Sequence, residues 1–229
     1  WLFQHLSELV PACSNIDEVE KELQLTFAEK GWCFLGGVTA PFRGPFIWKT
    51  NEKKSYTVEL PLGIQKVDVI FMSNFIMQSW LHYATFGEHY AGGWAKDEAL
   101  YCVKEAYEPL DDEVFNVSFL KHEAQHFYDY EHFPNLPGYA LEYRAKLVEL
   151  MEDRGRVWGN ILAEAKNDQQ FPHSYAAYLI RENIKTMYNL SGDQTEWQQL
   201  KMEDIQRAAK ILLDRSTDDL NNQREIDLL

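Results

Sequence analysis

The sequence predicts an α+β fold, in which an N-terminal helix and a small mixed or antiparallel sheet pack on a C-terminal helical lobe. Two observations predict this class. Short β-prone runs separated by glycine and proline dominate the chain to about residue 110, and helical periodicity dominates residues 111–229. With 229 residues and 45% hydrophobic content, the chain can bury one sizeable core. We therefore expect a single domain over residues 1–229, with a sheet-rich lobe at about 1–110 and a helical lobe at about 111–229.

The sheet-rich lobe is expected to begin with a helix over residues 14–30, because the apolar residues of this segment fall on one helical face. Strands are predicted in four β-prone runs, at residues 34–38, 46–49, 56–60 and 67–72. Residues 92–95 and 100–104 are expected to form a further pair of strands. This pair is either an ordinary hairpin that closes the sheet or an edge that holds an extended substrate.

The helical lobe is expected to begin at Asp111, which can cap a helix that starts at Asp112 and ends before Pro134. Further helices are predicted from apolar periodicity at residues 139–151, 158–165, 175–190 and 195–213. Residues 216–229 form a charged tail that is expected to fray. Because only a short break follows Pro134, we expect the first two helices of this lobe to be antiparallel neighbours.

The pentapeptide HEAQH, from His122 to His126, carries the strongest functional signal. Two imidazoles four residues apart on a helix point the same way and can bind one metal ion, and Glu123 between them completes the HExxH pattern of zinc hydrolases. Two hydrogen-bonded histidines at the edge of a core are the simpler alternative, but the spacing together with Glu123 favours a metal site. The histidines belong to an inward-facing stripe at helical steps, which consists of Phe115, Phe119, His122, His126 and Tyr130.

A catalytic zinc site needs a third protein ligand and keeps its fourth position for water. Glu142 is the leading candidate, because it lies in the first turn of the next predicted helix, which runs back beside His126. His132 is the alternative, since it has the spacing of the metzincin pattern HExxHxxGxxH, although Asp129 stands where that pattern has glycine. Without a metal, Glu142 would simply pair with Lys146 on a solvated helix face.

One segment of the chain resembles the gluzincin group of zinc metallopeptidases, to which thermolysin-like enzymes belong. Residues 118–149 read SFLKHEAQHFYDYEHFPNLPGYALEYRAKLVE, and they are also similar to a group of mostly bacterial proteins with comparable HExQH and LEYRAKL arrangements. The resemblance implies a zincin-like fold with an active-site helix. It also implies that His122, His126 and Glu142 are the zinc ligands and that Glu123 is the general base.

The chain departs from the gluzincin pattern at one position. Many gluzincins carry an aspartate four residues after the ligand glutamate, where it orients a histidine ligand, but Lys146 occupies that position here. Glu149 and Asp129 are the carboxylates that can replace the missing aspartate.

The implied activity is hydrolysis of peptide bonds in a peptide or protein substrate, with Zn²⁺ as the cofactor. Zinc lowers the pKa of a bound water to about 7, and Glu123 can accept its proton and pass it to the leaving amine. His173 is the candidate oxyanion donor, with Tyr175 and Tyr178 behind it, unless it is only a surface residue near a helix start. Two other functions stay open. One is a non-catalytic domain in which a metal or a hydrogen-bonded histidine cluster is structural, and the other is a zinc amidase on a non-protein substrate.

The composition limits the remaining classes of function. A net charge of −14, with 22 basic residues scattered among 36 acidic ones, argues against nucleic-acid binding. No membrane span is expected, since the longest apolar run, Val67 to Leu81, is interrupted by polar residues. Three separated cysteines favour a reducing, cytoplasmic compartment. An exported protein with a removed leader stays open, because the chain begins at Trp1 without an initiator methionine, and no oligomeric state is indicated.

Overall fold

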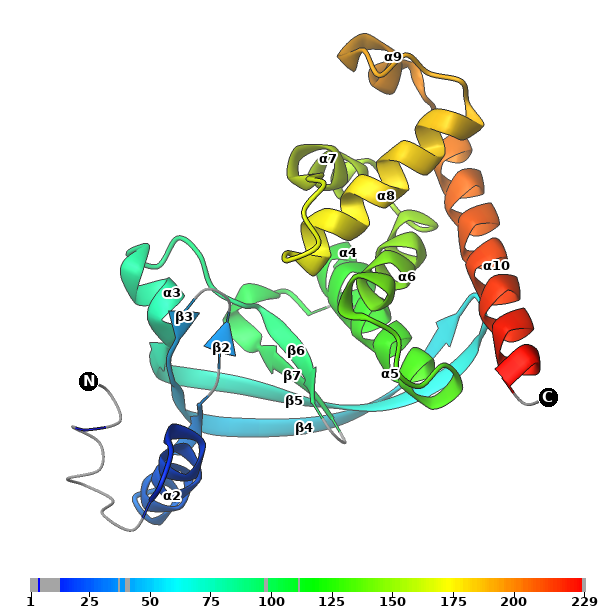
Figure 1. Ribbon diagram of the computed structural model, residues 1–229. Helices are drawn as coiled ribbons and strands as arrows, with labels where there is room; N and C mark the ends of the chain where they lie inside the picture. The colour runs from blue at the N-terminus through cyan, green and yellow to red at the C-terminus, as the bar shows by residue number, and fades with distance from the viewer. Residues whose placement is uncertain are drawn as a thin grey trace. The chain divides into compact units, whose positions relative to one another are not determined.

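The computed structural model describes Gln4 and residues 13–36, 38–39, 42–96, 99–110 and 112–227 (Figure 1). The protein is mixed α/β and forms two compact units. The sheet unit comprises Trp1–Ser55 and Asp68–Glu108, and the helical unit comprises Tyr56–Val67 and Pro109–Leu229. The boundary between Glu108 and Pro109 lies next to the division expected at about residue 110. Nothing in the sequence indicates that Tyr56–Val67, the end of a β-hairpin, groups with the helical unit.

The sheet unit contains most of a five-stranded mixed sheet with the strand order β1-β4-β5-β7-β6. β1 pairs with β4 and β6 pairs with β7 in antiparallel register, whereas β5 and β7 are parallel. The expected strand pair after residue 91 is therefore a hairpin at one edge of the sheet. The strands of the main sheet are β1 (Cys33–Leu35), β4 (Phe46–Leu60), β5 (Gly63–Gln78), β6 (Gly93–Lys96) and β7 (Ala99–Val103). A separate antiparallel pair is formed by β2 (Val38–Thr39) and β3 (Phe42–Arg43).

β4 is one long strand, although the sequence predicts two separate runs at residues 46–49 and 56–60. The residues between these runs are polar and exposed, so they lack the alternation that indicates a half-buried strand. Cross-strand contacts with β5 support the extended conformation instead. Ser55 Oγ donates a hydrogen bond of 2.5 Å to Asp68 Oδ1, and Lys53 Nζ lies 2.7 Å from Asp68 Oδ2.

α2 (Ile16–Glu29) is the helix predicted near the N-terminus, and Asn15 caps it by accepting backbone hydrogen bonds from Asp17 (3.1 Å) and Glu18 (3.0 Å). The helix packs against β1, where Phe27 and Phe34 stack with ring centroids 5.2 Å apart. α3 (Ser79–Ala84) follows β5, and the 3₁₀ turn η1 (Lys104–Ala106) follows β7. The core of the sheet unit is built on Phe46, Trp48, Met72 and Val103.

α6 (Gly138–Leu150) is the central helix of the helical unit (Figure 1). It packs against α5 (His122–His132), α8 (Pro172–Met187) and α10 (Met202–Asp227), and α7 (Arg156–Glu164) packs on α8. As a result, every residue from Arg144 to Leu150 is buried, including the charged Lys146 and Glu149. Charged side chains buried this deeply need partners: Glu149 and Arg144 find theirs on α5, and Lys146 finds its partner on α7.

Most helices of this unit agree with the predicted runs to within a few residues. The run predicted at 195–213 is instead two helices, α9 (Gln194–Gln199) and α10. The expected fraying of the tail is not found over residues 216–227, which continue α10, and residues 228 and 229 lie outside the described part. Among the described residues, no helix is long and apolar enough to cross a membrane, in agreement with the prediction.

Candidate metal centre

The HExxH motif lies at the start of α5, directly after an unusual helical segment. The preceding helix, α4 (Glu113–Phe115), is capped by Asp112, which accepts hydrogen bonds from the backbone of Val114 (2.8 Å) and Phe115 (3.1 Å). The predicted cap, Asp111, lies outside the described residues. Between α4 and α5 the chain forms a π-helix, η2 (Asn116–Lys121), where the sequence predicts a continuous α-helix. Such wider turns occur frequently at functional sites.

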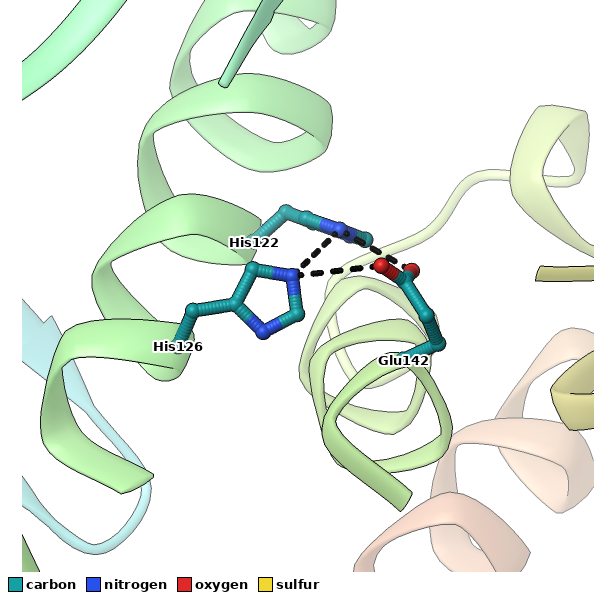
Figure 2. Close-up of side chains that lie close together, drawn as sticks. All are labelled: His122, His126 and Glu142. Atoms are coloured by element: carbon teal, nitrogen blue, oxygen red, sulfur yellow. Dashed lines mark hydrogen bonds and ion pairs between the residues drawn. The ribbon is translucent and has the colours of Figure 1, made fainter. Parts of the chain in front are cut away.

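His122 and His126 on α5 converge with Glu142 on α6 (Figure 2). The two Nε2 atoms are 3.2 Å apart, Glu142 Oε2 is 3.4 Å from His122 Nε2, and Glu142 Oε1 is 3.5 Å from His126 Nε2. In a tetrahedral zinc site with bonds of about 2.0–2.1 Å, neighbouring ligand atoms are about 3.3–3.4 Å apart. The three side chains therefore have the mutual spacing of three corners of such a site. Within the described part of the chain, this is the one group of three potential metal ligands.

A second carboxylate on α6 orients His122. Its Nδ1 lies 2.6 Å from Glu149 Oε1, and both side chains are buried. Because a carboxylate only accepts hydrogen bonds, Nδ1 carries a hydrogen, which leaves Nε2 as the nitrogen that could bind a metal. Burial lowers the pKa of His122, but the charge of Glu149 and hydrogen bonds to Glu142 and Glu149 outweigh burial and raise this pKa well above 6.5. A metal at Nε2 would therefore compete with a proton for this nitrogen.

Glu142 contacts a third histidine, His173, in the first turn of α8. His173 Nδ1 lies 2.8 Å from Glu142 Oε2, and its ring stacks on His122 with centroids 6.5 Å apart. Burial would raise the pKa of Glu142, but hydrogen bonds from His122, His126 and His173 lower it far below its usual range, so this side chain is a carboxylate. His173 is predicted as an oxyanion donor. Its Nδ1 is engaged with Glu142, its side chain is 63% exposed, and only Nε2 stays available for a substrate.

A buried ion pair fixes α5 against α6 beside the candidate ligands. Arg144 Nε lies 2.9 Å and 3.0 Å from the two carboxylate oxygens of Asp129, and both residues are almost fully buried. Gln125 donates a third hydrogen bond to Asp129, at 2.9 Å. Arg144 Nη1 also donates to Ser216 and Thr217 of α10, each at 3.1 Å. Asp129, the residue at the glycine position of the metzincin pattern, therefore stays within α5 and binds the neighbouring helix.

Glu123 and Tyr130 flank the cluster on α5. The half-buried Glu123 lies between the two histidines in the sequence, and its charge is among the causes that raise the pKa of both His122 and Tyr130. Tyr130 stacks on His126 with ring centroids 6.4 Å apart, yet 54% of the residue is exposed. The sequence predicts Tyr130 as part of an inward-facing stripe. This prediction is wrong, because α5 turns its last residues toward solvent and leaves Tyr130 at the rim of the cluster.

Other predicted residues do not join the cluster. His132, the alternative third ligand, is exposed, its Nδ1 lies 2.8 Å from the carbonyl oxygen of Tyr128, and its ring stacks on that tyrosine. Lys146 Nζ lies 2.6 Å from Glu164 Oε1 on α7, so it does not pair with Glu142. Tyr175 and Tyr178, the residues predicted behind His173, stack on each other with centroids 6.1 Å apart.

Comparison of the chain with protein-family models, with curated proteins and with solved structures finds no match. Functional inference therefore depends on the chemistry of the site itself. Two imidazole nitrogens and one carboxylate oxygen form the ligand type of a catalytic zinc ion, which takes three protein ligands and leaves one position open. The residues present thus fit such an ion in donor type, number and spacing.

Proposed function

We propose that this protein is a zinc-dependent hydrolase that cleaves peptide bonds. The observation that supports this proposal most strongly is the spacing of the donor atoms. The two Nε2 atoms and the Glu142 carboxylate are separated by 3.2, 3.4 and 3.5 Å, and Glu123 directly follows the first histidine. The nitrogen and oxygen donors suit zinc, whereas magnesium and calcium prefer oxygen donors alone. In this proposal the helical unit is zincin-like, and α5 is its active-site helix.

Each residue of the cluster has a separate role in the proposed reaction. Bound zinc would supply a water of lowered pKa and would polarise the substrate carbonyl. Glu123 accepts a proton on its carboxylate and returns it to the leaving amine. Glu149 holds the His122 ring so that Nε2 faces Glu142. His173 orients the Glu142 carboxylate through Nδ1, and its Nε2 can donate to the oxygen that becomes negatively charged.

The resemblance to gluzincins supports the same roles. Glu149 provides the orienting carboxylate that is missing at Lys146. Lys146 occupies the position of the aspartate that orients a histidine ligand in many gluzincins, and it pairs with Glu164. Glu149 lies further along the same face of α6 and holds His122 Nδ1 at 2.6 Å. In this protein Glu149, from a later turn of α6, can therefore orient the histidine ligand as the aspartate does in many gluzincins.

A structural role for the same cluster is the competing proposal. The three side chains already contact one another, so with or without a metal they can hold α5 and α6 together. A structural site needs no general base, so Glu123 distinguishes the two functions. An amidase that acts on a non-protein substrate would share the whole site and differ only in what it cleaves.

Metal analysis of the purified protein is the first test. The wild-type protein should carry about one equivalent of zinc, and the double variant His122→Ala, His126→Ala should carry none. His132→Ala is the matched control, because this histidine lies on the same helix outside the cluster, and it should retain the metal. About one equivalent of zinc in the double variant would refute the assigned site.

Glu123→Gln is the second test, and it separates catalysis from structure. The variant should keep its zinc content and its melting temperature but lose peptide hydrolysis, because the amide cannot accept the proton. Peptide libraries and cell-wall fragments should be assayed side by side to separate a peptidase from an amidase. Undiminished turnover by Glu123→Gln would exclude the proposed mechanism.

A further inference from the structure

The helical unit contains a cavity between α10 and the connection that joins α5 to α6. Its volume is about 590 Å³, within the range of about 300–1,000 Å³ that is typical of ligand sites. The wall is formed by residues within 132–140 and by Leu220 and Gln223 of α10. None of these described residues is Asp, Glu, Lys or Arg, although 25% of the chain is charged. None of the candidate metal ligands lines the cavity, so it is a separate feature with an uncharged wall.

Three rings in the wall of this cavity are fixed by neighbouring side chains. His132 stacks on Tyr128 with ring centroids 4.0 Å apart. The guanidinium carbon of Arg144 lies 4.9 Å from the centroid of the Phe133 ring, and Tyr139 meets a tyrosine of α8 edge-on at 5.3 Å. Arg144 also donates hydrogen bonds to α10, so the two sides of the cavity are held together. A wall fixed in this way loses little conformational freedom when a ligand binds.

We propose that this cavity binds an uncharged, proline-rich peptide segment in the polyproline II conformation. Such segments bind in grooves walled by aromatic rings, and their conformation is formed before they bind. Pro134 and Pro137 add further apolar surface to the wall. The hydroxyl of Tyr139 and the amides of Asn135 and Gln223 are hydrogen-bond donors. They suit a proline-rich chain, which offers carbonyl oxygens as acceptors and has no N–H at its prolines. This inference does not rest on the proposed hydrolysis.

Isothermal titration of the whole protein with octaproline, acetylated at one end and amidated at the other, tests the proposal. The control peptide is a capped glycine–serine octamer, which is also uncharged but is flexible and carries a backbone N–H at every residue. Octaproline should bind, and the control peptide should bind at least about tenfold more weakly, because it must lose conformational freedom. Both titrations should give the same result after a chelator has been added, because the cavity lies apart from the candidate metal ligands.

Variants of the wall locate the binding. Tyr139→Ala removes a ring and a donor and should weaken octaproline binding about 30-fold, as expected for a central aromatic contact. Gln223→Ala removes one hydrogen bond and should weaken binding about fivefold. Because Gln223 is exposed, this second variant should fold normally even if Tyr139→Ala is unstable. Asn222→Ala is the matched control, since Asn222 is the exposed neighbour of Gln223 on α10 and does not line the cavity, and it should leave the affinity unchanged.

Three results would overturn the inference: no binding of octaproline, equal binding of the two peptides, or an octaproline affinity that Gln223→Ala does not change. The zinc content of each protein, measured in parallel, keeps this test distinct from that of the proposed function. A zinc-loaded protein that does not bind octaproline would refute only the peptide site. A protein that binds octaproline but no zinc would refute only the metal centre.

Discussion

Arg144→Met should destabilise the helical unit strongly while leaving the side chains of the candidate metal centre unchanged. Methionine keeps most of the length of arginine and removes its charge. The change leaves Asp129, which is fully buried, with Gln125 as its remaining side-chain donor. It also removes the hydrogen bonds from α6 to Ser216 and Thr217 of α10.

The expected loss of stability follows from the burial of the Arg144–Asp129 ion pair. Removing one partner of a buried ion pair leaves an uncompensated charge and typically costs about 3–5 kcal/mol. This loss is a large part of the roughly 5–15 kcal/mol by which most domains are stable. For a chain of this size it corresponds to a fall in melting temperature of about 6–20 °C. Urea unfolding followed by far-ultraviolet circular dichroism would measure it, because helices dominate that signal.

The stability lost in Arg144→Met should depend on pH in a defined direction. Burial raises the pKa of Asp129 above 3.8 and Arg144 lowers it, so removing Arg144 should raise this pKa further. A carboxyl group with a raised native pKa binds its proton more tightly in the folded than in the unfolded protein. Stability is therefore lost as the pH rises from the unfolded pKa, near 3.8, through the raised native pKa. The difference between wild type and Arg144→Met should be largest at neutral pH and should shrink toward pH 4.

Asp129→Asn provides the matched comparison. In the double variant Asp129→Asn, Arg144→Met neither charge is present, so the double variant should be more stable than Arg144→Met alone. Two results would refute the reasoning: a loss below about 1 kcal/mol for Arg144→Met, or a loss that does not change between neutral and acidic pH.

Three further predictions concern the metal site and one helix cap. Glu149→Gln should weaken zinc binding by about 10- to 100-fold, because it removes the charge that orients His122, and a competition titration with a chelator would measure this. A chelator should also destabilise the zinc-loaded wild type, by about 2.7 kcal/mol relative to protein in zinc at 100 times its Kd, and should not affect the His122→Ala, His126→Ala variant. Asp153→Ala should lower stability by about 1–2 kcal/mol with zinc content unchanged, because the buried Asp153 accepts hydrogen bonds from the backbone at the start of α7, at 2.9 and 2.8 Å. An equal melting temperature for Asp153→Ala would contradict the last of these.

The sequence predicts the candidate cluster well because its members belong to local patterns. The spacing of His122 and His126 requires only one helical turn, and Glu142 follows from an antiparallel pair of helices joined by a short break. Glu149 is predictable as a possible orienting carboxylate for the same reason, since it shares a helical face with Glu142. Periodicity also identifies the helices of this unit, because each has an apolar face against a neighbour.

Features that depend on distant contacts are not predictable in this way. The π-helix before His122 has no local signal, because wide turns are retained by packing and not by residue preference. The partner of Arg144 is another example, since Asp129 and Thr217 lie on different helices and the sequence spacing does not relate them. The prediction of two short runs in place of the long strand β4 is wrong for a related reason. Its exposed polar residues are extended by cross-strand pairing, which leaves no alternation of burial to detect.

The antiparallel arrangement of α5 and α6 explains why, among the described residues, an orienting carboxylate reaches one candidate ligand histidine and not the other. Contacts between the helices pair His122 with Glu149 and His126 with Glu142, so moving toward the C-terminus of α6 means moving toward the N-terminus of α5. A carboxylate that reached the Nδ1 of His126 would have to approach from elsewhere, and within the described residues this buried nitrogen has no hydrogen-bond partner. Asp129, three residues after His126 on α5, is already held by Arg144. In the proposed metal site His122 would therefore be the fixed ligand, whereas the ring orientation of His126 would depend on the metal and on Tyr130 stacked against it.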